Sequence, residues 1–376
     1  MQIKKRPEDF VVEEVISVTH NKDDCLVFTL EKKNWDTIGA VKAIARALKV
    51  SQKRLGYAGL KDKRAVTRQK VSVTGVGAEA LTQVTIPGIT ITDIEQGDCI
   101  HLGGHTGNMF DILVRDVELP ENIHQRIKRG FPNYFGEQRF GKIRPITHEV
   151  GKALIQNDLE KAALIFLAKP FLKDPNYKIR KALWETKDFQ TAKKEFPLSL
   201  KYERAMLNSI HKGYKKAFEA LPVRLNMLFI HAYQAYLFNK IIKKRIQEVP
   251  IHVVEPKDVV VSQFKGKTVM TVAGPHNMDM ITKNKLCAAA PIIGYKTQVW
   301  GRMKYITEDV LHKEEIKKGD FTIKAFPRLS SRGTYRQILG KASHVVYDLE
   351  KEGVKIRFFL PKGQYATVFL NNLFNE

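Results

Sequence analysis

The sequence predicts an α+β protein with two domains. Its 376 residues exceed the length of about 150 that a single domain usually has. Residues near both ends, at 10–14 and 356–360, alternate between apolar and polar side chains as β-strands do. From Thr147 onward the composition changes to lysine-rich segments with helical patterning. Segregated strands and helices favour an α+β architecture.

The N-terminal part is predicted to hold short strands and one helix. Asp36 and Thr37 precede apolar residues at helical spacing, so a helix is expected to start there and to end near Leu48. Gly107-Asn108, ahead of the last of these strands, is typical of a turn and, with Phe110, also forms a G-N-x-F pattern. The expected strands are at residues 10–14, 25–30, 69–74, 89–94 and 110–117.

Helices dominate the middle of the chain. A short basic helix is expected at 123–128, with mixed helical patterning at 150–168, 176–186 and 200–219. Pro222 opens a long helix, because the first helical turn does not need the N–H that proline lacks. At the C-terminus, alternation at 356–360, a turn at 361–363 and a second arm at 365–370 predict a hairpin.

The charge balance points to a polyanionic partner. Lysine and arginine number 63 against 40 aspartates and glutamates, a net charge of +23. Such an excess attracts polyanions and speeds their encounter with the protein. No long basic amphipathic helix with exposed aromatics suits an anionic membrane, and no apolar run is long enough to span a bilayer.

Other compartments and cofactors are not indicated. The charged N-terminus lacks the apolar region of a signal peptide. Cys25, Cys99 and Cys287 are far apart, so we expect neither a zinc site nor a disulfide framework, and a reducing, cytoplasmic location. The sequence contains no P-loop and no complete dinucleotide fingerprint, so no nucleotide cofactor is expected.

Residues 56–69 contain a single carboxylate, Asp62, among four cations. Gly56 and Gly59 precede it and allow a close backbone approach or a positive φ. Because a strand follows, Asp62 is expected on a loop between two short strands, where rigid scaffolds present reactive groups. On the residues alone, an acid in a basic loop is more often a solvated ion pair.

Residues 132–141 combine three aromatic side chains with amides and an arginine. Aromatic rings stack on nucleobases and amides bind base edges, so the segment suits base recognition. Taken alone, such a cluster is more often part of a core.

These stretches resemble the signatures of the TruD family of tRNA pseudouridine synthases. Residues 56–69 match a motif close to G-Y/F-A-G-x-K-D-K/R-x-A-V-T-x-Q without a gap, and residues 133–141 match N-Y-F-G-x-Q-R-F-G. Residues 7–14 resemble P-E-D-F-V-V-E-E, and 360–367 resemble L-P-x-G-x-Y-A-T. Residues 232–239 resemble A-x-Q-S-x-L-F-N, with Ala235 in place of the usual serine.

The resemblance implies roles for individual residues. Asp62 would be the catalytic aspartate. Lys4, three residues ahead of Pro7 in the 7–14 motif, would pair with it. Phe135 would stack on the target uracil, and Asn133 would belong to the same pocket. The cations of these motifs are expected to bind RNA, namely Lys61, Lys63, Arg64, Arg68 and Arg139.

The resemblance also implies a fold and a reaction. The fold would be a mixed, largely antiparallel pseudouridine synthase core from 1–147 and 333–376, with an inserted TRUD domain at 148–332. The reaction would be isomerisation of uridine to pseudouridine in tRNA, at position 13, on a flipped-out base. We expect a monomer that needs no metal or other cofactor and has no membrane partner.

Two alternatives remain open. The chain could be a non-catalytic RNA-binding protein, although an acid in a phosphate-binding loop would weaken affinity. It could also carry out the same chemistry on a different RNA, such as small nuclear or messenger RNA. The resemblance leaves open whether Asp62 acts as a nucleophile or as a base.

Overall fold

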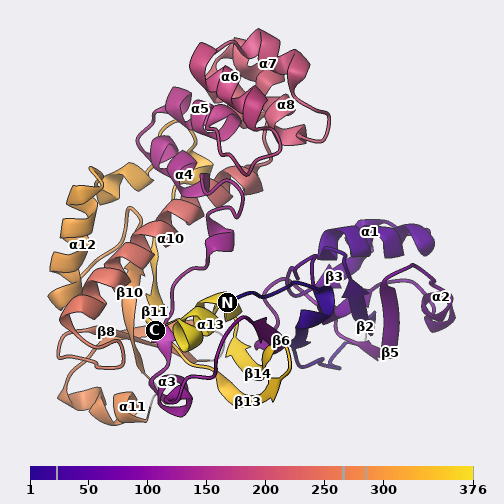
Figure 1. Cartoon of the computed structure of the whole chain (residues 1–376), viewed down its shortest axis with the longest axis vertical. Helices are drawn as coiled ribbons and strands as arrows, with labels where there is room; N and C mark the ends of the chain where they lie inside the picture. The colour runs from indigo at the N-terminus through magenta and orange to yellow at the C-terminus, as the bar shows by residue number, and fades with distance from the viewer. Residues whose placement is uncertain (23, 265–266, 284–285, 376) are drawn as a thin grey trace. The chain divides into compact units, whose positions relative to one another are not determined.

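The computed structural model describes residues 1–22, 24–264, 267–283 and 286–375, and its chain divides into two compact units (Figure 1). Unit 1 is Met1–Phe131 with Gly340–Glu376, and unit 2 is Pro132–Leu339. The chain passes between the units through two short strands that pair, β7 (Phe131–Pro132) and β12 (Leu339–Gly340). The unit limits therefore lie outside the predicted insertion of 148–332 at both ends.

Unit 1 is built on an eight-stranded sheet of order β13-β14-β6-β1-β4-β2-β5, with β3 paired to β4. Strands β1 and β4 run parallel, and the other pairs in the sheet are antiparallel, as predicted. Strand β14 pairs with β6 along nine residues, so the C-terminal strands complete a sheet begun by the N-terminal ones. The strands are β1 (Phe10–Val15), β2 (Cys25–Lys33), β3 (Leu55–Tyr57), β4 (Val66–Val73), β5 (Ile89–Gly97), β6 (Gly107–Arg115), β13 (Ser343–Glu350) and β14 (Gly353–Pro361).

Helices form separate cores with the two halves of this sheet. Helix α1 (Thr37–Ala47) starts at the predicted place, and the Asp36 side chain accepts a hydrogen bond from Gly39 N at 2.8 Å. Its buried face shares a core with Phe28, Leu30 and Val71. Helices α3 (Ile123–Arg129) and α13 (Ala366–Phe374) share the second core, with β6 and β14 (Figure 1). The short helix α2 (Ala78–Thr82) precedes β5.

Helix α13 corrects the predicted C-terminal hairpin, because residues after the turn at 361–363 form a helix instead of a second strand. Ala366, Phe369, Leu370 and Leu373 are spaced along one helical face and are all buried. The Phe369 ring packs against Phe358 of β14 at a centroid distance of 4.7 Å. This packing favours the helix.

Two further predictions in unit 1 are wrong. Gly107-Asn108 is not a turn but the beginning of β6. Cys25 and Cys99 form a disulfide, with Cα atoms 5.2 Å apart, although their sequence separation of 74 gave no sign of it. The β2–β5 pairing, which sets Cys25 opposite Gly97, brings the two cysteines together.

Unit 2 is mainly helical and contains one four-stranded sheet. Its sheet has the order β11-β10-β8-β9, from strands β8 (Val259–Phe264), β9 (Lys267–Val272), β10 (Cys287–Ile292) and β11 (Thr334–Gln337). The helices are α4 (Thr147–Ile155), α5 (Leu159–Ala168), α6 (Tyr177–Thr186), α7 (Phe189–Glu195), α8 (Lys201–Ser209), α9 (Tyr214–Glu219), α10 (Val223–Glu248), α11 (Met278–Thr282) and α12 (Gly301–Lys313).

Helix α10 is the long helix predicted after Pro222 and forms the centre of unit 2. It spans 26 residues and packs against α4, α12 and β10 (Figure 1). Its buried Gln234 donates hydrogen bonds to Ile293 O at 2.5 Å and to Ser331 Oγ at 2.8 Å. These bonds attach two loops to the helix. None of the helices in the described part of the chain is long and apolar enough to cross a membrane.

Candidate active site

Asp62 lies on the loop between β3 and β4, as the sequence predicts. The buried Ala58 and Ala65 anchor the two ends of this loop, whereas the Asp62 side chain is 38% exposed. Gly56 allows the close approach expected of it, because a Cβ atom there would lie 2.2 Å from Ile100 O. The loop therefore presents one accessible carboxylate from a packed base.

The ion pair expected between Lys4 and Asp62 is present, and it joins Lys4 Nζ to Asp62 Oδ2. The Lys4 ammonium also lies 3.9 Å from the centroid of the Phe10 ring, a cation–π contact. The Lys4 side chain is only 15% exposed, so water screens this pair less than it screens a surface ion pair.

Hydrogen bonds from three buried side chains hold the main chain around Asp62. Gln69 Nε2 donates to Gly59 O at 3.1 Å, and Thr37 Oγ1 accepts from Lys61 N at 2.9 Å. Lys32 Nζ donates to Asp62 O at 3.0 Å and to Trp35 O at 2.6 Å. The loop is therefore fixed on both sides of Asp62 and at Asp62 itself, which preorganises the carboxylate.

Lys32 is fully buried, and the sequence gave no indication of this. Burial lowers its pKa to about 8, although the Asp36 and Asp62 carboxylates partly oppose that change. The amine keeps two N–H groups after it loses its proton, so both carbonyl acceptors stay bonded in either state.

Lys61 does not fit its predicted role of binding RNA. Its side chain is 6% exposed and its Nζ atom lies 2.6 Å from Glu14 Oε1, in a carboxylate that is itself inaccessible. The same Nζ atom donates to Asn108 Oδ1 at 2.7 Å. Because strands β1 and β6 bring these partners from distant parts of the chain, Lys61 faces the interior and anchors the loop.

The other cations of this loop are exposed. Arg64 Nη2 donates to Lys5 O at 2.7 Å, and Arg68 Nε lies 2.6 Å from Glu31 Oε2. Lys63 is also exposed. These exposed side chains are accessible to phosphate groups, although Glu31 already offsets the charge of Arg68.

Unit 2 holds the remaining predicted residues, which cluster around the Phe135 ring. The Arg336 guanidinium carbon lies 4.2 Å from the ring centroid and that of Arg139 lies 5.4 Å from it. Phe238 packs edge-on against the same ring at 5.4 Å. The Phe135 main chain is bound at both N and O by the Asn239 side chain. An aromatic ring with two guanidinium groups suits nucleobase stacking.

Asn133 is 4% exposed, and both ends of its amide are bound within the protein. Its Nδ2 donates to Gln337 O at 2.9 Å, and its Oδ1 accepts from Arg336 Nη2 at 2.6 Å. Asn133 thus orients Arg336 over Phe135. Arg336 was not among the predicted site residues, although its Gly333-x-x-Arg336 pattern resembles the family.

The other residues missed from the sequence are Glu14, Lys32 and Asn108. Asn108 belongs to a G-N-x-F pattern that also reads as a turn, and the other two look like ordinary charged strand residues. Among the described residues, no group of three histidine, cysteine or acidic side chains is placed to hold a metal ion.

Comparisons with known proteins agree over the whole chain. A family model described as tRNA pseudouridine synthase D (TruD) matches residues 1–373. A Thermococcus sibiricus protein named "Probable tRNA pseudouridine synthase D" is 36% identical over 400 residues, with 100% of this chain and 95% of the relative covered. An Archaeoglobus fulgidus protein of the same name is 37% identical over 388 residues, with 98% and 93% covered.

A solved structure supports the same assignment. The crystal structure of a Methanosarcina mazei protein described as "Putative tRNA pseudouridine synthase D (TruD)" matches with a TM-score of 0.83 at 31% identity. The match covers 100% of this chain and 93% of that one, and it confirms the expected mixed α+β fold. The chain therefore belongs to the TruD family of tRNA pseudouridine synthases.

Proposed function

We propose that this chain isomerises uridine to pseudouridine in tRNA, at position 13, with Asp62 as the catalytic carboxylate. The observation that carries the proposal is the Asp62 loop, where an accessible carboxylate pairs with Lys4 and its main chain is held by buried side chains. The enzyme acts as a monomer in this proposal, with neither metal nor other cofactor. Residues 148–332 form the inserted TRUD domain.

The reaction itself needs no added atoms. The bond between ribose C1′ and uracil N1 breaks, and a bond between C1′ and C5 forms. The proton on C5 is lost and N1 gains one, so the product is an isomer of the substrate. The target nucleotide must leave the stack, because a side chain cannot reach C1′ or C6 inside it.

Asp62 serves either as a nucleophile or as a base, and both roles require the carboxylate to be ionised. The Lys4 ammonium neutralises that charge when a bound base excludes water from the loop. Phe135 stacks on the flipped uracil, with Arg336 and Arg139 placed at the ring. Lys63, Arg64 and Arg68 contact phosphate groups.

The Asp62→Asn variant tests the proposal because it is nearly isosteric and removes only the carboxylate. We expect no isomerisation of a tRNA transcript with uridine at position 13, and RNA binding equal to or slightly tighter than wild type. Asp93→Asn is the control: Asp93 is an exposed acid of β5 at φ 49°, a conformation that asparagine also adopts, so its activity should equal wild type.

Three results would oppose parts of the proposal. Turnover by Asp62→Asn would remove Asp62 as the catalyst. Tight RNA binding by the wild type without any pseudouridine would favour a non-catalytic RNA-binding protein. Modification of a transcript that has cytidine at position 13 would move the target to another uridine.

A further inference from the structure

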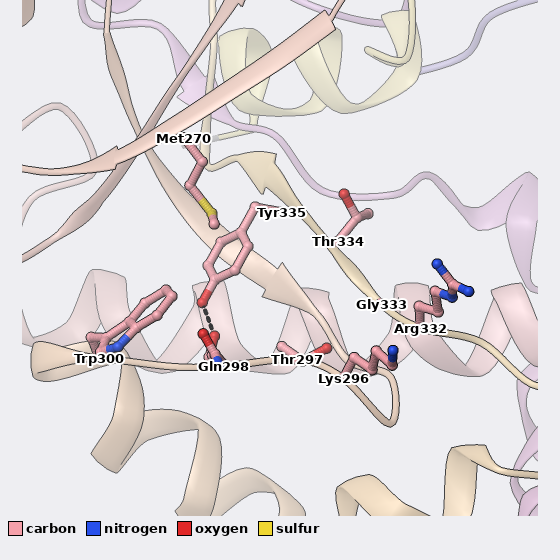
Figure 2. A pocket seen from close by; sticks show the side chains of 9 residues that line it. All are labelled: Met270, Lys296, Thr297, Gln298, Trp300, Arg332, Gly333, Thr334 and Tyr335. Carbon is pink, nitrogen blue, oxygen red and sulfur yellow. Dashed lines mark hydrogen bonds between the residues drawn. The ribbon is translucent and has the colours of Figure 1, made fainter.

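A pocket of about 270 Å³ lies in unit 2, between the 296–300 segment and β11 (Figure 2). This volume is just below the range of about 300–1,000 Å³ typical of pockets that enclose drug-sized ligands, so it fits a smaller group. None of the described residues that line it is acidic. None of them belongs to the site described above.

The pocket is preformed by two main-chain segments packed back to back. Tyr295 N donates to Ser331 O at 2.9 Å, and Lys296 N donates to Arg332 O at 3.1 Å. Gly333 adopts φ +82°, and a Cβ atom there would lie 2.0 Å from Thr297 Oγ1. Gln234 of α10 holds the second segment through Ser331. A rigid frame lowers the entropic cost of binding.

Two aromatic rings form one wall of the pocket. The rings of Trp300 and Tyr335 are 17° from parallel, with centroids 6.3 Å apart. The Tyr335 hydroxyl donates to Gln298 O, and burial raises its pKa to about 12, so it remains a donor at neutral pH. Trp300 is 38% exposed, so part of its side chain is accessible to a ligand.

Two cations lie at the opposite end from Trp300, with Tyr335 between (Figure 2). Lys296 and Arg332 are exposed, and neither forms an ion pair with any residue that the structure describes. Met270 covers the apolar part of the wall beside Tyr335. A flat apolar wall next to uncompensated positive charge matches a nucleobase and its phosphate.

We infer that this pocket binds an unpaired nucleotide of the RNA substrate. The base stacks on the Trp300 and Tyr335 wall, and the adjoining phosphate contacts Lys296 and Arg332. Aromatic stacking tolerates any base, so the pocket should bind an unstacked nucleotide without specificity for its base. The inference rests on the proposed function only in taking RNA as the ligand.

Trp300→Ala tests the pocket in the full chain, with wild-type protein and a tRNA transcript as the probe. Loss of one stacking contact should raise the Kd and the KM about 5- to 150-fold. The kcat at saturating tRNA should not change, because the pocket takes no part in bond making. Trp184→Ala, which removes an indole of similar exposure (41%) from α6, is the matched control and should bind as wild type.

Two more variants separate stacking from folding. Trp300→Phe should recover most of the binding, because it retains a ring. The double substitution Lys296→Gln with Arg332→Gln alters only exposed side chains, and it should weaken binding and flatten its salt dependence. Wild-type affinity in both Trp300→Ala and the double variant would overturn the inference.

Free uridine monophosphate distinguishes a nucleotide ligand from RNA. If it quenches tryptophan fluorescence at micromolar concentration in the wild type but not in Trp300→Ala, and does not compete with tRNA, the pocket takes a free nucleotide and the inference is wrong. A wild-type protein that needs Trp300 to bind tRNA but makes no pseudouridine would uphold the pocket and overturn the proposed function. Normal turnover and a normal KM in Trp300→Ala would uphold the proposed function and overturn the pocket.

Discussion

Two lysines act on Asp62 through different atoms. Lys4 pairs with its carboxylate, whereas Lys32 is buried below the loop and binds its main-chain oxygen. Because Lys32 contacts no solvent, it acts on the reaction only by positioning. Lys32→Met leaves the Asp62 and Trp35 carbonyl oxygens without their donor, and an unsatisfied buried group costs about 1–3 kcal/mol. We expect kcat to fall about 5- to 100-fold with an unchanged Kd for tRNA. Lys33→Met is the control, since Lys33 is 51% exposed and pairs with Glu8.

The pH dependence of stability separates positioning from a general defect. The native pKa of about 8 lies below the value near 10.4 of an unfolded lysine. Between these values the unfolded chain binds more protons, so the contribution of Lys32 to the free energy of unfolding rises with pH. The difference in melting temperature between wild type and Lys32→Met should move in favour of wild type from pH 8 to 10. A constant difference, or a loss of tRNA affinity in Lys32→Met, would contradict this account.

At the scale of elements, three helices of unit 2, α5, α6 and α8, meet around a buried guanidinium. Arg180 of α6 lies 2.8 Å from both Asp174 and Glu203 and donates to Leu167 O of α5 at 2.6 Å. Arg180→Met leaves Asp174 and Glu203 with the longer ion pairs to Arg144, at 3.3 and 4.0 Å, and breaking a buried ion pair costs about 3–5 kcal/mol. Urea unfolding followed by the fluorescence of Trp184, also on α6, should show a loss near that size. Lys181→Met is the control at the next position. Lys181 forms an exposed ion pair with Glu185 at 3.7 Å, so its loss should change the free energy of unfolding by less than about 1 kcal/mol. Equal urea midpoints for the two variants would contradict the assigned importance of Arg180.

The elements also show where sequence reasoning succeeds. Helix α1, the long α10 and the Asp62 loop were predicted because their signals are local: a capping aspartate, a proline at a helix start, and a basic loop between strands. The burial of Lys61 and Lys32 could not be predicted, since it depends on strands that are remote in sequence. Likewise, the packing of Phe369 on Phe358 stabilises α13 as a helix. The pairing of β2 with β5 brings Cys25 and Cys99 close enough to form their disulfide. Tertiary contacts decided each of these cases.

At the scale of the whole molecule, the net charge of +23 governs how the protein meets RNA. Each phosphate neutralised by a cation releases counterions, so log affinity should fall linearly with log salt concentration, by about 0.7–0.9 per contact. With six to ten contacts, the affinity for tRNA should fall about 10³- to 10⁵-fold from 50 to 200 mM salt.

The exposed Lys63, next to Asp62, should be one of these contacts. Lys63→Gln should therefore make the slope shallower by about one unit. Lys216→Gln is the control, because Lys216 is already paired with Glu219 at 2.7 Å and should leave the slope unchanged. Filter binding or fluorescence anisotropy across this salt range measures all three slopes. A nearly flat wild-type slope would mean that the basic surface meets something other than RNA, and an unchanged slope in Lys63→Gln would remove Lys63 from the contacts.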